Sequence, residues 1–211
     1  MIVAFALRTG RRLLLAILLT LGACQSTAPP PADPYLGLLP AGRQVSQAAQ
    51  AFPISGAKAK SVGFVLTNST DKQLEFLEKY VQELKTNPLL VYAPEADELV
   101  KPQFLLTSIV NKLKERFGRV EALQDLRGAR TVDYVALVDI ALEFPHGFAH
   151  YFQYQIRVDI LTRDLERIGS LSGFGYESYY CVGATCAVPA SFKAMKSAIA
   201  QFDGAADNAL K

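Results

Sequence analysis

Two cysteines near the end of the sequence have types and spacing suited to covalent chemistry. Cys181 and Cys186 flank a short glycine-containing loop in the stretch CVGATC. In an oxidising compartment this arrangement favours a disulfide, whose stabilisation would be modest because the closed loop is short. Two free thiols and a metal site are the alternatives; a metal would need further ligands nearby, and the spacing is not C-x-x-C.

A second group of candidate residues could bind a metal ion. Glu143, His146 and His150 stand together in EFPHGFAH, and carboxylate and imidazole groups are zinc ligands. The histidines, however, stand on a predicted hairpin loop rather than one turn apart on a helix, as they do in H-E-x-x-H. We therefore interpret them as solvated loop residues and predict no metal site.

Other motifs for chemistry are weak. Gly173 and Gly175 form a G-x-G, but a phosphate cradle requires a helix directly afterwards and strand-type residues follow instead. Asp139 and Arg157 stand on consecutive predicted strands, where they would lie nearly opposite each other as a structural pair. No G-x-S-x-G nucleophile motif is present. The sequence therefore predicts a protein that is not an enzyme and needs no cofactor.

The amino-terminal residues have the pattern of an export signal. Three arginines at positions 8, 11 and 12 precede an apolar run, residues 13–21, which ends at Gly22 and Ala23. The run is much shorter than the ~20 residues that a transmembrane helix needs. We therefore predict that residues 1–23 are a signal peptide. A plain signal followed by an incidental cysteine is the alternative to the lipoprotein signal described next.

Leu21-Gly22-Ala23-Cys24 resembles the lipobox of bacterial lipoproteins. The resemblance implies that Cys24 receives a diacylglyceryl group on its thiol, becomes the first mature residue and is then acylated, for example with palmitate. Two or more acyl chains give stable membrane anchoring. Gln25 follows, and a residue other than Asp there implies sorting to the outer membrane, with the domain in the periplasm.

The charge composition does not favour a nucleic-acid partner. Three of the 22 Lys and Arg residues lie in residues 1–23 with no acidic residue, so the mature chain has 19 basic and 20 acidic residues. Binding of nucleic acid requires clustered Lys and Arg. We therefore expect no nucleic-acid partner.

The mature chain divides into a tether and one domain. Residues 24–60 include STAPPPADP and are predicted to form a stiff, extended tether, with apolar residues at 35–39 and 51–54 able to dock on the domain. Residues 61–211 are predicted to form one α+β domain with a single core. Its sheet is expected to be mixed, mainly antiparallel, and packed by helices on one face.

The hydrophobic patterns place the elements of this domain. VDYVALVDIALEF predicts a central strand covered on both faces, and the alternation over residues 152–160 predicts a strand with one buried face. Glycines in the next strand, residues 168–180, predict a bulge or bend. Thr70 and Gln73 predict a capping box at the start of a helix. Further strands are predicted at 61–67, 89–92 and around 120, and further helices from 102 and over 190–202.

SVGFVLT, FLLTSIVNKLKERF, ARTVDYVALVDIAL and YQIRVDILTRDLERIGSLSGFG together resemble a group of small envelope proteins. The group comprises curli-secretion-channel lipoproteins, lipoprotein activators of penicillin-binding proteins and the amino-terminal domain of the Tol-system propeller protein. The resemblance covers roughly residues 60–205 and implies an anticodon-binding-like domain without cofactor or catalytic residues. CVGATC is not part of that pattern, and an insertion able to form a membrane barrel is not evident.

The combined expectation is a non-catalytic, lipid-anchored outer-membrane protein. Its periplasmic domain would bind another envelope protein as an assembly, secretion or cell-wall accessory. Aromatic residues at 151–154 and 174–180 would form a binding patch if they face outward, and core packing is the alternative explanation for them. A subunit of a homo-oligomeric ring in an export apparatus and a periplasmic ligand-binding protein are the alternative functions.

Overall fold

The computed structural model describes residues 38, 46–47, 52–86, 101–144, 151–180 and 184–211. Its helices are three α-helices and two short 3-10 helices: α2 (Asn68–Thr86), α4 (Pro102–Arg116), α5 (Ala184–Ala209), η1 (Ala57–Ala59) and η2 (Leu126–Thr131). Its strands are β1 (Ser46–Gln47), β2 (Ser61–Leu66), β3 (Arg119–Ala122), β4 (Tyr134–Glu143), β5 (Tyr151–Thr162) and β6 (Glu166–Ser178). The strands form one sheet in the order β1-β6-β5-β4-β2-β3.

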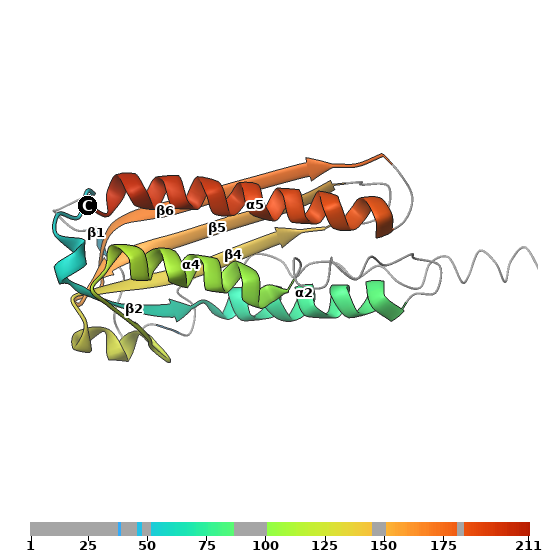
Figure 1. The fold of residues 1–211 in the computed structure, drawn as a ribbon. Helices are drawn as coiled ribbons and strands as arrows, with labels where there is room; N and C mark the ends of the chain where they lie inside the picture. Colours follow the sequence, from blue (N-terminus) through green and yellow to red (C-terminus); the bar gives the residue numbers. More distant parts are fainter. Residues whose placement is uncertain (1–37, 39–45, 48–51, 87–100, 145–150, 181–183) are drawn as a thin grey trace, which may run out of the picture.

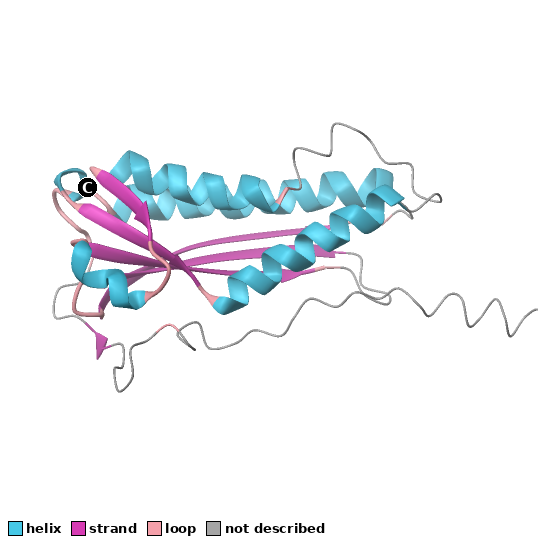
Figure 2. Ribbon diagram, turned by 90° about the horizontal axis from the view of Figure 1, so that it is seen from below, coloured by secondary structure: helices cyan, strands magenta, loops and turns pink. Residues whose placement is uncertain are grey.

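The sheet is mixed. β4, β5 and β6 form an antiparallel meander, while β2 runs parallel to both β3 and β4. β1, which comes from the segment predicted to be a tether, pairs in parallel with the start of β6. The predicted α+β class is confirmed, with α4 and α5 side by side over one face of the sheet (Figures 1 and 2). The strand predicted at 89–92 lies outside the described residues.

The main core lies between the α-helices and the sheet. The alternation predicted for β5 is confirmed, because its even-numbered side chains from Phe152 to Ile160 are completely buried on the helix side. They pack against α4 and α5, which contribute Leu105, Met195 and Phe202 to the same cluster. Each large apolar side chain buried in this way stabilises the fold by roughly 1.5–3 kcal/mol.

Two glycines bring α5 into contact with β6. A Cβ atom would lie 2.0 Å from the Ala198 carbonyl oxygen if built on Gly173, and 1.7 Å from the Ala194 carbonyl oxygen if built on Gly175. The helix therefore lies directly over this strand. The predicted bulge is present nearer the start of β6, where the register shifts between Ile160 and Leu161 of β5.

A second, smaller cluster lies on the opposite face of the sheet, whereas the sequence predicted a single core. It contains side chains from β2, β4, β5, η2, the residue that follows η2 and the turn before β6: Val65, Leu126, Ala129, Val132, Val135, Leu137, Leu161 and Leu165. Leu38 belongs to it as well and is 7% exposed. Period-two alternation explains the pattern, since strand residues that point away from the α-helices need a cover of their own.

The packed chain begins before Ser61. The backbone of Ile54 donates to the carbonyl of Ala209 at 2.8 Å and accepts from the N–H of Lys211 at 3.1 Å. The ring of Phe52 lies against Gly169 of β6. Residues 52–60 are therefore part of the domain, and of the apolar residues expected to dock, Leu38 and Ile54 are buried.

The predicted capping box at Thr70 and Gln73 is wrong. Thr67 caps α2 instead, because its hydroxyl oxygen accepts a hydrogen bond from the N–H of Thr70 at 3.0 Å. The Thr70 hydroxyl bonds to β4, donating to the Val138 carbonyl at 3.0 Å and accepting from the Ile140 N–H at 2.8 Å. Once β2 has ended, the first turns of α2 take its place beside β4.

Candidate functional site

The sheet face opposite the α-helices is the candidate functional site. Side chains alternate along a strand, so the residues that are not in the main core point to this face. Part of this face is covered by the second cluster, which includes Val135, Leu137 and Leu161. The remaining residues of β4, β5 and β6 on this face are neither uniformly charged nor uniformly apolar: Asp139, Ala141, Glu143, Tyr151, Gln153, Gln155, Arg157, Asp159, Ser170, Ser172, Phe174, Tyr176 and Ser178. The cross-strand register brings the aromatic members together at one end.

Tyr151, Phe174 and Tyr176 form what we call the aromatic face. The rings of Tyr151 and Tyr176 stack with their centroids 5.5 Å apart and their planes at 30°. Phe174 is 43% exposed and Tyr176 is 50% exposed, and Tyr180, just beyond β6, is 96% exposed. Exposed aromatic side chains on a rigid sheet provide contact area for a protein partner without a large loss of side-chain entropy on binding.

A hydrogen bond fixes one ring of the aromatic face. The hydroxyl of Tyr151 donates to the carboxylate of Glu143 on the neighbouring strand. This hydrogen bond raises the pKa of Tyr151 above its ordinary value, because the negative carboxylate opposes loss of the phenolic proton. Tyr151 therefore remains a neutral aromatic platform for Tyr176.

A polar row crosses the same face beside the aromatic residues. The Arg157 guanidinium donates two hydrogen bonds of 3.0 Å to the carboxylate of Asp159, which is almost completely buried. The hydroxyl of Ser170 donates to the same carboxylate. The register confirms that Asp139 lies opposite Arg157, and Asp139 accepts a hydrogen bond from Thr67 at 2.7 Å. These contacts hold the strands and their side chains in place.

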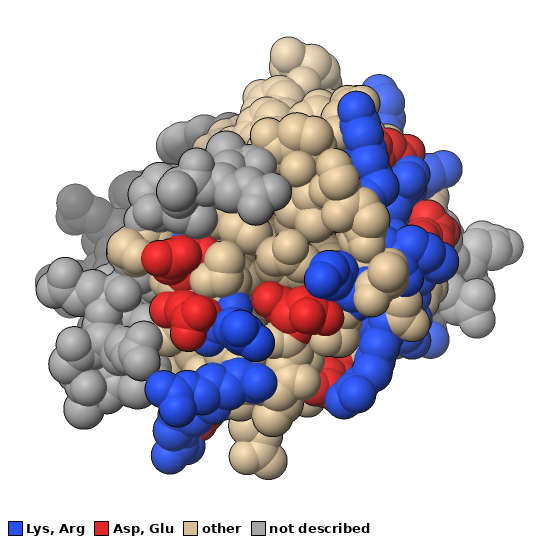
Figure 3. All heavy atoms as spheres, turned by 90° about the vertical axis from the view of Figure 1, so that its left-hand side faces the viewer, with Lys and Arg blue, Asp and Glu red and all other residues tan. Residues whose placement is uncertain are grey.

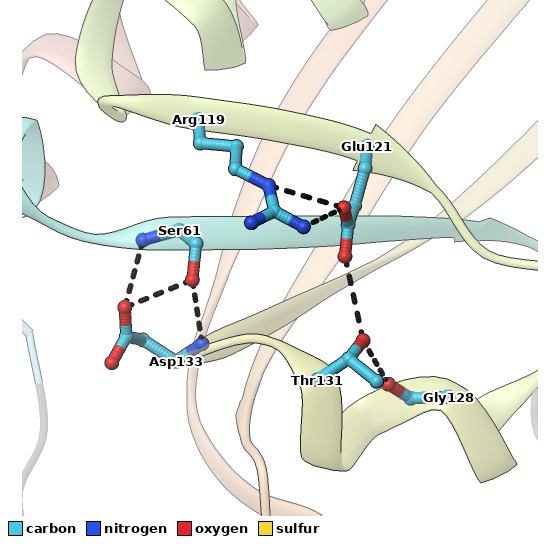
Figure 4. Close-up of polar contacts among 6 residues, drawn as sticks. All are labelled: Ser61, Arg119, Glu121, Gly128, Thr131 and Asp133. Atoms are coloured by element: carbon cyan, nitrogen blue, oxygen red, sulfur yellow. Dashed lines mark hydrogen bonds and ion pairs between the residues drawn. The ribbon is translucent and has the colours of Figure 1, made fainter.

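A separate polar cluster closes the other end of the sheet (Figure 4). The carboxylate of Asp133 accepts from both the N–H and the hydroxyl of Ser61 at 2.9 Å, and the hydroxyl oxygen of Ser61 accepts from the Asp133 N–H at 3.0 Å. Arg119 donates to Glu121, which also accepts from Thr131 at 3.4 Å. One set of contacts joins the start of β2 to the residue before β4, and the other joins β3 to η2, so these contacts are structural.

The same end of the molecule carries many charged side chains. Figure 3 shows Lys and Arg interspersed there with Asp and Glu. Arg127 pairs with Asp125, and the ammonium group of Lys58 donates to the carbonyl oxygens of Lys114 and Glu115 at the end of α4. Positive and negative groups offset one another locally, so this end offers a weaker binding signal than the aromatic face.

Most of the cysteines and histidines considered as candidate site residues lie in parts of the chain that the structure does not describe. Cys24, Cys181, His146 and His150 lie outside the described residues, and only the backbone of Cys186 is described, in α5. The described residues therefore do not test the predicted lipidation of Cys24, the predicted disulfide or the interpretation of the histidines as solvated loop residues. Among the described residues, no three His, Cys, Asp or Glu side chains lie close enough together to hold a metal ion.

Sequence reasoning did not separate the exposed aromatic residues of β6 from those in the core. The strand alternates polar or aromatic residues on the open face with Leu171, Gly173 and Gly175 on the helix side. Because two of the three inward residues are glycines, the apolar period of two is absent from the sequence. The sequence signal for the exposed positions is the pair of glycines two residues apart, Gly173 and Gly175, because the residues between and after them, Phe174 and Tyr176, then point to the opposite face.

The sequence matched no family model and no curated protein. None of the described helices is both long and apolar enough to cross a membrane.

Proposed function

We propose that this protein is a non-catalytic, lipid-anchored adaptor of the bacterial outer membrane, whose periplasmic domain binds another envelope protein through the aromatic face. The observation that carries the proposal is the exposure of Phe174 and Tyr176 on a sheet that the main core holds rigid. Residues in such positions contribute most to binding when a partner excludes water from them. The anchor is the acylated Cys24 that the lipobox-like stretch implies.

The length of the chain between the anchor and the domain supports this arrangement. Cys24 stands 14 positions before Leu38, so the intervening chain spans at most about 50 Å. Leu38 packs in the second cluster with Leu137 and Leu161, on the same face of the sheet as the aromatic residues. The adaptor therefore keeps the second cluster within about that distance of the membrane that holds Cys24. The aromatic face begins at Tyr151, ten residues from Leu161 along β5, and so lies within roughly 35 Å more.

The anchor is tested by the mass of the mature protein. The expected mass corresponds to a chain that begins at Cys24 and carries a diacylglyceryl group and a further acyl chain. Cys24→Ser is the control, because it removes the thiol and is expected to release the protein from the membrane fraction. A mature chain that begins at another residue, or that lacks acyl groups, contradicts the proposed anchoring.

The binding face is tested in intact cells with the photo-crosslinker p-benzoylphenylalanine in place of Tyr176. We expect one discrete adduct with an envelope protein, and loss of that adduct when Phe174→Ala is added. The same crosslinker in place of Glu78, an exposed residue of α2, is the matched control. Equal adducts from both positions, or none from position 176, contradict the proposed function.

A further inference from the structure

The outer edge of β6 pairs with few of the described residues. One side of β6 pairs with β5 along its length. On the other side, β1 pairs with Glu166 and Arg167, and none of the other described strands pairs with β6 beyond that point. In an antiparallel ladder, alternate residues point their N–H and C=O groups away from the neighbouring strand. The outer edge therefore presents a row of backbone donors and acceptors.

The residues of this row follow from one hydrogen bond. The N–H of Phe174 donates to the side-chain oxygen of Gln201 on α5 at 3.2 Å, so the backbone of Phe174 points outward. The register is continuous over this part of β6, and the direction repeats every two residues. Ser170, Ser172, Tyr176 and Ser178 therefore point their N–H groups the same way. These residues and Phe174 are all exposed.

Another strand edge in the same domain is closed by side chains of a helix. β2 ends at Leu66, and beyond that point α2 closes the edge of β4. The side chains of Thr70 and Gln73 accept hydrogen bonds from the N–H groups of Ile140 and Leu142. Natural proteins usually close or block free strand edges, because such edges pair with other chains. On β6, Gln201 accepts from one of five outward N–H groups.

We propose that the outer edge of β6, from Ser170 to Ser178, accepts an extended segment of a partner protein as an added strand. This inference rests on the proposed adaptor function and specifies how the partner binds. Addition of a strand to a sheet edge supplies main-chain hydrogen bonds for affinity and side-chain contacts for specificity. β1 is a precedent within the chain, since it is an extended segment that pairs with the first residues of the same edge.

The position of α5 selects the kind of occupant. α5 lies directly over β6, in contact with Gly173 and Gly175. If β6 of a second copy paired with this edge, the two α5 helices would lie about 5 Å apart, the spacing of neighbouring strands. Packed helices need about 8–10 Å between their axes. The occupant is therefore a linear segment of another protein that carries no helix on that side.

The surroundings of the edge define the side chains of that segment. On the open face, alternate residues of the added strand would lie beside Phe174 and Tyr176, which favours aromatic or β-branched residues there. On the helix side, the other residues would lie beside α5, where Lys193, Ser197 and Gln201 are exposed at intervals of four. Polar or acidic residues suit these positions. The segment thus alternates apolar and polar residues.

The test uses the full mature chain with Cys24→Ser and a phage-displayed library of random 12-residue peptides as the probe. Ser172→Pro removes one outward N–H while leaving the β5–β6 ladder intact, since proline is tolerated at strand edges. Ser172→Ala is the matched control, because it keeps the N–H. Selected peptides are expected to bind the Pro variant at least about tenfold more weakly than the Ala variant, as expected for a lost backbone hydrogen bond and a steric block.

A second variant does not depend on tolerance of proline. Gln201→Ala frees the Phe174 N–H for the added strand, so peptides should bind about two- to fivefold more tightly, because they no longer compete with the glutamine. Bound peptide should also slow hydrogen exchange of the Ser172 and Tyr176 amides. Peptides that are insensitive to both variants, or the absence of any edge-dependent binder, overturn the proposal.

Two further outcomes separate strand addition from the adaptor function itself. The crosslink from position 176 in cells should decrease in Ser172→Pro and persist in Ser172→Ala. An equal crosslink in both variants overturns strand addition while the adaptor function stands. If the purified chain forms a multimer that Ser172→Pro dissociates, the edge pairs copies of this protein and the inference of a different partner is overturned.

Discussion

The hydroxyl oxygen of Thr70 accepts a hydrogen bond from the backbone N–H of Ile140 at 2.8 Å. A side chain of α2 thereby replaces the strand that would otherwise pair with β4 at this point. Thr70 and Gln73 are both almost completely buried, so their polar atoms depend on these contacts. The edge of β4 is closed from within the domain. Along the outer edge of β6 from Ser170 to Ser178, by contrast, the part of the chain that the structure describes supplies an acceptor for one outward N–H group, that of Phe174.

Thr70→Val should therefore destabilise the domain. The substitution keeps the shape of the side chain but leaves the buried N–H of Ile140 without its acceptor, which costs about 1–3 kcal/mol. Thr70→Ser keeps the hydroxyl and is the control. Urea unfolding provides the measurement, together with faster exchange of the Ile140 amide in the Val variant. Equal stability of the Val and Ser variants would contradict the role assigned to this hydroxyl.

Gly173→Ala should separate α5 from β6. The added methyl group would meet the Ala198 carbonyl oxygen at 2.0 Å, and backbone atoms cannot move aside as a flexible side chain can. We expect a loss of about 3 kcal/mol in the free energy of unfolding. Gly204→Ala in α5 is the control, because a Cβ atom built on Gly204 would have no atom of another element within 4 Å. That change should raise stability by about 0.5–1 kcal/mol.

A buried hydroxyl pair joins β5 to α5, and its coupling can be measured. The hydroxyl groups of Tyr154 and Ser191 lie 2.6 Å apart, and burial raises the pKa of Tyr154 well above its ordinary value. Tyr154→Phe and Ser191→Ala each leave one buried hydroxyl unpaired, whereas the double variant leaves none. A double-mutant cycle from denaturant unfolding should give a coupling energy of about 1 kcal/mol. Additive losses would show that the pair contributes no coupling.

Asp133 should make the stability of the domain sensitive to acid. The hydrogen bonds that its carboxylate accepts from the N–H and the hydroxyl of Ser61 lower its pKa in the folded state. The folded pKa then lies below the unfolded value of about 3.9, so the stabilisation is present above that pH and is lost as the pH falls through the folded pKa. Asp133→Asn should be less stable than the wild type at pH 7, and this difference should shrink at low pH. Urea midpoints at neutral and acidic pH measure both, and equal pH profiles would exclude this contribution.

The hydrophobic periods in the sequence predicted the parts of the fold that depend on neighbouring residues in the chain. β5 has one buried face because Phe152, Tyr154 and Ile156 alternate with polar residues. β4 was recognised as central because its run is almost continuously apolar. Burial of an apolar side chain is a property of its own residue and strand, so periodicity was enough.

Interactions between distant segments decided the rest. The Thr70–Gln73 spacing matches a capping box, but in the structure both side chains form hydrogen bonds with the backbone of β4, which lies far along the chain. Leu165 adopts a positive φ of 68° in the turn before β6, where glycine or asparagine is usual, and its side chain is buried in the second cluster.

The exposure of Phe174 and Tyr176 likewise followed from the tertiary structure. Their orientation depends on the register of β6 against β5 and on the contact of Gly173 and Gly175 with α5. Local sequence sets which side chains prefer to leave water. The register and the packing of distant elements set which of them find a partner, because a residue's partners across the sheet and on the helices lie far from it along the chain.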